Sequence, residues 1–258
     1  MTEATELTGK VAVVTGGSRG IGEAIATTLA QHGADVVITS RKQHALDAAA
    51  DRIRSVGPSG RVLAVEAHVA DPSAAAEVMT VAREQLGPVS ILINNAATNP
   101  YMGALIDIDQ ARAEKTTSVN MLAPITWVHA AREAGMAAGG SVVNIASIGG
   151  LRIDPNIGYY NATKAALIHI TRQLAYELGP EIRVNAVAPG LVKTDLARAL
   201  WEEQESRISA ALPLGRLGTV EDIAQAALFL AGPRASWISG HTLVVDGGAM
   251  VNPVIAGE

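Results

Sequence analysis

Three side chains near the middle of the sequence have the types and spacing needed for proton transfer at an oxygen atom. Ser147 carries a hydroxyl, Tyr160 a phenol and Lys164 an ammonium group. Tyr160 and Lys164 are four residues apart, so on a helix they lie on one face, one turn apart. Because a nearby ammonium favours the phenolate, we expect Lys164 to lower the pKa of Tyr160 from its ordinary value of about 10. Such a phenol can protonate a carbonyl oxygen or accept a proton from an alcohol.

A tyrosine and a lysine at this spacing also occur on many helices without a catalytic role, so the pair predicts catalysis only together with the residues around it. Apolar residues recur at helical spacing downstream, at 162, 166, 170, 174 and 178. Ser147 follows an apolar run, residues 141–146, that predicts a buried strand, and two glycines come after it. A hydroxyl at the end of such a strand is typical of a site on an open parallel sheet.

The elements that must position these residues alternate regularly along the chain. We expect strands at residues 10–15, 35–40, 61–69, 90–96, 141–147, 182–188 and 242–246, with helical patterns between most of them. Asp71 before Pro72, and Thr219 with Asp222, have the form of helix N-terminal caps. The alternation predicts an α/β fold, a doubly wound parallel sheet of seven strands, in a single domain spanning residues 1–258.

The composition narrows the functional classes. Of the 258 residues, 48% are hydrophobic and 3% aromatic, as expected for strands buried on both faces. The net charge is −5 without a long basic run, so we expect no nucleic-acid partner. The absence of cysteine excludes disulfides and thiolate metal sites, the histidines lack ligand spacing, and we expect no metal. Neither a leader nor a membrane span is recognisable, which favours a cytoplasmic protein without membrane partners.

A glycine-rich turn lies between the first expected strand and the first helix. Thr15, Gly16, Gly20 and Gly22 form the pattern T-G-x-x-x-G-x-G. Glycines allow the backbone to approach a pyrophosphate, and the helix N-terminus then faces the phosphates. A glycine turn by itself can simply connect two elements, but its place at the head of the first βαβ unit predicts dinucleotide binding in a Rossmann fold.

The end of the second strand distinguishes the two nicotinamide cofactors. An acidic residue there would hold the ribose 2′-hydroxyl and repel a 2′-phosphate. This chain has Ser40 and Arg41 instead, and Arg19 adds a second guanidinium from the glycine turn. Two guanidinium groups suit a phosphate, so we expect NADP(H) rather than NAD(H). In the alternative interpretation, Arg41 and Lys42 only begin a solvated helix.

Five motifs in this order resemble the short-chain dehydrogenase/reductase family over essentially the whole chain. They are TGGSRGIG at 15–22, NNAA at 94–97, Ser147, the YxxxK pair and APG at 188–190. The sequence is similar to the 3-oxoacyl-carrier-protein reductases. It is still more similar to the NADP-dependent carbonyl and retinol reductases, through TSRKQ at 39–43, NAATNP at 95–100 and APGLVKT at 188–194.

The resemblance implies a role for each catalytic position. Tyr160 would be the acid–base residue, Ser147 would hold the substrate oxygen, and Lys164 would bind the nicotinamide ribose. Asn120 matches the fourth catalytic position, which holds a water of the proton relay. Pro124 lies four residues on and has no N–H, so on a helix the Asn120 carbonyl would be free for that water. Pro124 can also simply begin the next helix.

The resemblance also implies which residues contact the cofactor, and at one of these positions the chain departs from the family pattern. His68 stands where an aspartate usually meets the adenine amino group. A neutral histidine can still accept that hydrogen bond. The residues expected to contact the cofactor are Gly16, Ser18, Arg19, Gly20, Ile21, Gly22, Ser40, Arg41, His68, Val69, Asn95, Ala96, Tyr160, Lys164, Pro189, Gly190, Val192 and Thr194.

Residues 191–216 form an insert in which we expect an amphipathic helix. The resemblance implies that this insert is the substrate lid. In the alternative interpretation, the apolar face of the helix packs permanently on the body of the protein. The resemblance further implies a homotetramer. The residues expected to contact substrate are Thr98, Asn99, Met102, Ile148, Ile153, Leu196, Leu200 and Trp201.

These patterns together predict an NADP(H)-dependent oxidoreductase that moves a hydride between nicotinamide and a carbonyl or secondary alcohol. An apolar lid favours a 3-oxoacyl thioester, or an apolar ketone or aldehyde. The alternatives are an NAD-dependent alcohol dehydrogenase of the same family and a cofactor-sensing protein without turnover. A dehydratase or epimerase of the family's longer branch fits less well, because its glycine turn is spaced TGxxGxxG and its substrate domain is larger.

Overall fold

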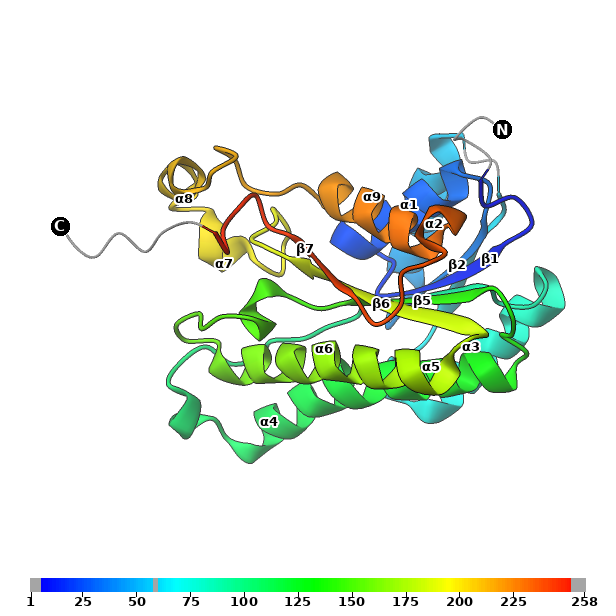
Figure 1. Ribbon diagram of the computed structural model, residues 1–258, viewed down its shortest axis with the longest axis horizontal. Coiled ribbons are helices and arrows are strands. Elements are labelled where there is room, and N and C mark those ends of the chain that lie inside the picture. Colours follow the sequence, from blue (N-terminus) through cyan, green and yellow to red (C-terminus); the bar gives the residue numbers. More distant parts are fainter. Residues whose placement is uncertain (1–5, 58–59, 252–258) are drawn as a thin grey trace.

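Seven parallel strands form one twisted sheet in the computed structural model (Figure 1). The structure describes residues 6–57 and 60–251, so the first residues of the predicted domain and of the stretch searched for a leader lie outside it. The strands are β1 Val11–Thr15, β2 Asp35–Ser40, β3 Val62–Glu66, β4 Ile91–Asn94, β5 Gly140–Ile145, β6 Ile182–Pro189 and β7 Thr242–Val245. Their order in the sheet is β3–β2–β1–β4–β5–β6–β7, which confirms the predicted doubly wound fold.

The chain first winds outward from β1 to β3, returns to pair β4 with the free side of β1, and then winds the other way to β7. The reversal opens a crevice beyond the carboxyl ends of β1 and β4, where open parallel sheets bind their ligands. The helices are α1 Gly20–Gln31, α2 Gln43–Ser55, α3 Pro72–Gln85, α4 Gln110–Thr117, α5 Ala123–Glu133, α6 Gly158–Leu178, α7 Arg198–Trp201, α8 Glu205–Ala211 and α9 Val220–Ala231.

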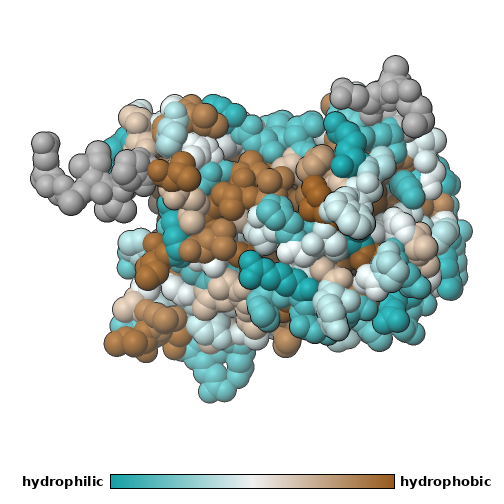
Figure 2. All heavy atoms as spheres, viewed as in Figure 1, coloured by the Kyte–Doolittle hydropathy of each residue, from teal (hydrophilic) through white to brown (hydrophobic). Residues whose placement is uncertain are grey.

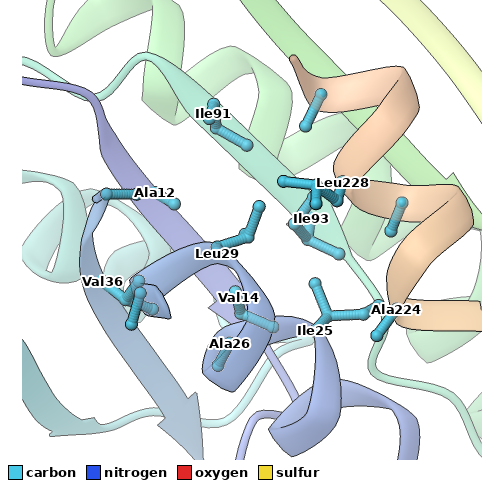
Figure 3. Packing of buried hydrophobic residues seen from close by; sticks show 14 of the residues in the cluster. Ala12, Val14, Ile25, Ala26, Leu29, Val36, Ile91, Ile93, Ala224 and Leu228 are labelled. Atoms are coloured by element: carbon cyan, nitrogen blue, oxygen red, sulfur yellow. The ribbon is translucent and has the colours of Figure 1, made fainter. Parts of the chain in front are cut away.

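Helices cover both faces of the sheet. On one face α1, α2 and α9 pack on the strands, and Ile25, Leu29 and Leu228 meet the side chains of Val14 and Ile93 in a fully aliphatic cluster (Figure 3). On the other face α3, α5 and α6 close a second cluster, on the opposite side of the sheet in Figure 1. Strands covered in this way carry apolar side chains on both faces, which explains the Val- and Ile-rich sequence.

The predicted caps are confirmed. The Asp71 carboxylate accepts a hydrogen bond from the Ser73 N–H, with Pro72 in the first turn of α3. Thr219 and Asp222 form a reciprocal capping box at the start of α9, and Arg216 binds the same carboxylate with both guanidinium nitrogens, at 2.6 and 2.9 Å. The end of the insert is thereby tied to the body of the protein.

The third expected strand and the insert differ most from the structure. The third strand ends at Glu66 rather than residue 69, because the chain leaves the sheet there to form the wall of the crevice. The insert contains two short helices, α7 and α8, instead of one amphipathic helix. Trp201 donates from its indole N–H to the Thr194 carbonyl at 3.3 Å, so the segment folds back on itself where α7 ends. Within the described residues, no helix has the length and apolar character to cross a membrane.

Candidate active site

A cleft of about 550 Å³ opens at the carboxyl edge of the sheet and contains most of the predicted site residues. All eighteen residues expected to contact the cofactor line it, as does Ser147. Figure 2 shows apolar side chains gathered on the left half of the viewed face, where Figure 1 places α7, α8 and β7.

The phosphate end has the shape of a backbone cradle. Gly16 and Gly20 have φ values of +67° and +57°, which L-residues rarely adopt. A Cβ on Gly22 would lie 2.3 Å from the Gly16 carbonyl oxygen. Asn95 Nδ2 donates to the carbonyls of Thr15 and Gly16, at 2.8 and 3.2 Å, and so ties the turn to β4.

The first helix leaves its N-terminal N–H groups available at this cradle. Its N-cap, Arg19, has an extended backbone and makes no side-chain cap. The unsatisfied N–H groups of a helix start form an anion site, so this end fits the pyrophosphate of a dinucleotide.

The end of the cleft beside β2 carries the expected cations. Arg41 is exposed at the end of β2 and lines the cleft with Ser40. The Arg19 side chain is 70% exposed and lies 3.8 Å from the Asp195 carboxylate of the insert. His68 accepts a hydrogen bond at Nδ1 from the Ala70 N–H at 3.3 Å. The imidazole acceptor considered for an adenine amino group is thus already engaged.

The other end brings the three catalytic candidates together. Ser147 follows β5, and Tyr160 lies in the first turn of α6 and hydrogen-bonds Ser147. Lys164 lies one turn further, is 2% exposed, and donates from Nζ to the Ile145 carbonyl at 2.7 Å. Its Nζ is 5.6 Å from the centroid of the Tyr160 ring. The helical pair and the strand end thus meet as their spacing predicts.

The expected lowering of the Tyr160 pKa is wrong for this structure. Burial among the cleft walls raises the pKa of Tyr160 to about 12, while the hydrogen bond with Ser147 lowers it and the charge of Asp154 raises it further. Lys164 bonds a backbone carbonyl instead of the phenol, and its own burial lowers the pKa of Lys164 to about 8. Burial disfavours the charged form of each group.

Asn120 lies beneath the cleft, 1% exposed, in a π-helical turn over Ser118–Leu122. Its side chain accepts from the Thr98 N–H at 2.9 Å, and donates to the Thr98 carbonyl and to Thr163 Oγ1. Thr163 Oγ1 in turn donates to the Tyr160 carbonyl at 2.7 Å. Pro124 lies in the first turn of α5, as in the alternative interpretation.

The expected substrate residues divide into two groups. Thr98, Asn99, Ile148, Leu196 and Leu200 line the cleft. Met102, Ile153 and Trp201 do not: Ile153 is 94% exposed, and the Trp201 indole is turned to the insert's own backbone.

Sequence reasoning missed several residues of the cleft wall. Asp154 and Arg152 fall inside the stretch from Ser147 to Lys164, and two opposite charges in so apolar a loop were the available signal. Thr163 gave no signal, since only the fold places it under Asn120. The missed lining residues include Lys115, Val119, Arg152, Asp154, Pro155, Ile157 and Ala197.

Comparisons with known proteins agree with this geometry. A family model described as enoyl-(acyl carrier protein) reductase matches residues 16–250. The chain is 40% identical over 252 residues to dehydrogenase/reductase SDR family member 4 of Mus musculus, covering 96% of this chain and 90% of the relative. It is 39% identical over 242 residues to tropinone reductase-like 3 of Erythroxylum coca, covering 93% of each. The chain belongs to the short-chain dehydrogenase/reductase family.

Two solved structures superpose on 95% of the chain. A blue fluorescent protein from a metagenomic library, solved with NADPH, is 38% identical with a TM-score of 0.86, covering 95% of this chain and 99% of that one. A short-chain dehydrogenase from Burkholderia cenocepacia J2315, solved with NADP, is 37% identical with a TM-score of 0.86, covering 95% and 100%. These complexes and the cradle at Gly16–Gly22 indicate a nicotinamide dinucleotide as the cofactor.

Metal ligands do not gather anywhere in residues 6–57 and 60–251: no group of three or more histidine, aspartate or glutamate side chains is placed to hold an ion.

Proposed function

We propose that this protein is an NADP(H)-dependent reductase that converts an apolar ketone, aldehyde or 3-oxoacyl thioester into the alcohol. The observation that carries the proposal is the composition of one cleft. Ser147, Tyr160 and Lys164 meet at one end of it, and the glycine turn with Arg41 forms the other. A bound dinucleotide that spans the cleft would bring its nicotinamide to the phenol.

A nicotinamide bound in this cleft would supply the hydride for the carbonyl carbon. Ser147 and Tyr160 donate hydrogen bonds to the carbonyl oxygen, where negative charge develops in the transition state. Tyr160 then transfers its phenolic proton to that oxygen, and its high pKa keeps the phenol protonated at neutral pH. Below a pH of about 8 Lys164 is an ammonium, which stabilises the phenolate left after transfer.

The Asn120 network fixes the start of the catalytic helix. Asn120 joins the Thr98 backbone on one side to Thr163 on the other, and Thr163 holds the carbonyl of Tyr160. These bonds hold the first turn of α6, which carries the phenol, against the loop that follows β4. We propose that Asn120 acts in catalysis as a positioning residue, and that its backbone carbonyl holds a water of the proton relay.

The preference for NADP(H) is supported by the cations at the end of β2. Arg41 is exposed and, among the described residues, has no ion-pair partner, so its guanidinium is available to a 2′-phosphate. Hydrogen bonds to charged groups contribute about 1.5–3 kcal/mol, or roughly ten- to hundredfold in affinity. Arg41→Ala should therefore raise the NADPH dissociation constant by about that factor and leave the NADH constant nearly unchanged.

Fluorescence titration of both cofactors measures this effect. Arg83→Ala on α3 is the matched control, because Arg83 is an exposed arginine outside the cleft. Equal losses for NADPH and NADH in the Arg41 variant would refute the cofactor preference.

The apolar substrate class is supported by the insert. Leu196 and Leu200 line the cleft, while 57% and 38% of their surface is exposed. Side chains of this kind gain burial when a substrate binds or the lid closes, and we propose that residues 191–216 are the substrate lid.

A substrate panel tests the function directly. It compares 3-oxoacyl thioesters with small ketones, diketones and aldehydes, each with NADPH and with NADH. Turnover with NADPH on carbonyl substrates supports the proposal, and the fastest class identifies the substrate type. Binding of NADPH without turnover on any carbonyl would instead favour a cofactor-sensing protein.

We also propose a homotetramer. Exposed apolar side chains on α5, α6 and the adjoining π-helical turn support an interface, with Leu122 and Ile125 exposed by 55% and 41% and Tyr176 by 85%. Sedimentation equilibrium checks the mass of the assembly.

A further inference from the structure

We propose that Asp154 tunes the acid–base residue: its carboxylate, held in the cleft wall against the turn that follows Ser147, opposes loss of the Tyr160 proton and so sets the pH at which the enzyme begins to oxidise alcohols. This inference rests on the proposed function, because it concerns the proton that Tyr160 exchanges with substrate.

The geometry places the carboxylate against the catalytic serine turn. Asp154 lies in the loop between the 3₁₀ turn Ile148–Gly150 and α6, and it lines the cleft together with Tyr160. A methyl group at Gly149 would lie 3.2 Å from Asp154 Oδ2, and the Gly149 N–H donates to Ser147 Oγ at 3.1 Å. The Asp154 carboxylate therefore lies close to Gly149, and Gly149 donates to the Ser147 hydroxyl that hydrogen-bonds the Tyr160 phenol.

Neighbouring groups hold Asp154 in this place. Its Oδ1 accepts a hydrogen bond from Arg152 Nε at 3.0 Å, and Arg152 Nη1 donates onward to the Ala249 carbonyl at 3.3 Å. The Asp154 backbone carbonyl faces Asn161 Nδ2 at 3.4 Å, next to Tyr160 in α6. The Asp154 side chain is 24% exposed, so water screens its charge only in part.

The other charges around the cleft do not replace it. Asp195, the second carboxylate of the wall, pairs with Arg198 at 2.5 Å and Arg19 at 3.8 Å. Lys164 on α6 acts in the opposite sense, since an ammonium favours the phenolate. The remaining titratable or charged groups of the wall are Arg19, Arg41 and His68 toward the end beside β2, Lys115 on α4, and Arg152 itself. Asp154 is thus the carboxylate whose charge raises the pKa of Tyr160.

The Asp154 charge should therefore affect the pH dependence of carbonyl reduction and of alcohol oxidation differently. Reduction requires the protonated phenol, whereas oxidation requires the phenolate as base. A carboxylate beside Tyr160 extends the pH range of reduction and moves alcohol oxidation to higher pH. The equilibrium of the overall reaction is unchanged, since Asp154 acts only on the enzyme.

The test is the pH dependence of alcohol oxidation at saturating NADP⁺, with the alcohol of the fastest carbonyl in the substrate panel. Asp154→Asn removes the charge and keeps the shape, so the midpoint of the profile should fall by about half to one pH unit, a modest shift for a paired and partly exposed charge. Arg152→Gln removes the compensating cation and should move the midpoint upward. Asp154→Glu keeps the charge and should retain the wild-type midpoint.

Opposite shifts in the Asp154→Asn and Arg152→Gln variants support the inference, because damage to the loop would not reverse sign. An unshifted Asp154→Asn profile, or equal shifts in both variants, overturns it while the proposed function stands. Full turnover in Tyr160→Phe would overturn the proposed function instead. If Asp154→Asn fails to fold, the direction of the Arg152→Gln shift alone decides.

Discussion

Replacing Gly22 by alanine tests how the glycine turn builds the cofactor end of the cleft. The new Cβ would lie 2.3 Å from the Gly16 carbonyl oxygen and 2.4 Å from Asn95 Nδ2, both far inside van der Waals contact. Either α1 moves away from β1, or Asn95 gives up its bonds to the carbonyls of Thr15 and Gly16. Both outcomes deform the backbone that faces the pyrophosphate.

The magnitude follows from these two contributions. Overpacking costs about 1–3 kcal/mol, and each lost hydrogen bond about 0.5–1.5 kcal/mol. We therefore expect Gly22→Ala to lower the free energy of unfolding by roughly 2–6 kcal/mol when both Asn95 bonds are lost. NADPH affinity should fall with it, because the distorted groups are those that face the cofactor. Urea denaturation measures the first quantity and fluorescence titration the second.

Gly135→Ala is the matched control. Gly135 has a φ of +103°, but a Cβ at this position would meet no atom within 4 Å, so its substitution carries a backbone cost without a clash. That cost is about 1–2 kcal/mol, and NADPH binding should not change. If Gly22→Ala were no more destabilising than Gly135→Ala and bound NADPH normally, the steric account of the cradle would be refuted.

Two further variants test the capping box and the buried ammonium. Asp222→Asn should lower the free energy of unfolding by about 1–2 kcal/mol at neutral pH. Because Arg216 holds the pKa of Asp222 at about 2, this difference between wild type and variant should persist above pH 4 and disappear as the pH falls toward 2. Urea denaturation at each pH measures it. Lys164→Met should abolish turnover while the protein stays folded. Burial lowers the pKa of Lys164 from 10.5 to about 8, so between these pH values the unfolded chain holds a proton that the folded chain has lost. The free energy of unfolding of the wild-type protein should therefore rise between pH 8 and 10.5. A rise that persists in the Met variant would show that another group is responsible.

The layered fold could be predicted from local patterns, because buried parallel strands, glycine turns and helix caps each leave a signal within a few residues. The strand at 35–40 and the caps at Asp71 and Thr219 appear where those signals place them. The insert was predicted less well, since its apolar residues fit one helix as well as two. Bonds such as that of Trp201 to the Thr194 carbonyl decide between them, and they exist only in the folded chain.

The candidate site divides in the same way. The spacing of Tyr160 and Lys164 predicted that they share one helix face, and the structure places them there. The spacing carried no information on burial. Because Tyr160 is buried, its pKa is raised rather than lowered as expected. The contributions of Thr163 and Asp154 also depend on segments that meet only through the fold, beneath Asn120 and beside Gly149.

The central claim is that the Tyr160 phenol exchanges a proton with substrate beside the nicotinamide. Tyr160→Phe removes one oxygen and leaves the ring, so turnover at saturating NADPH and carbonyl substrate measures what the phenolic hydroxyl contributes as proton donor and hydrogen-bond donor. Transfer by a positioned acid contributes about 10²–10⁴ to the rate. The account predicts a loss of at least that size with an unchanged NADPH dissociation constant; a phenylalanine variant with wild-type turnover would contradict it.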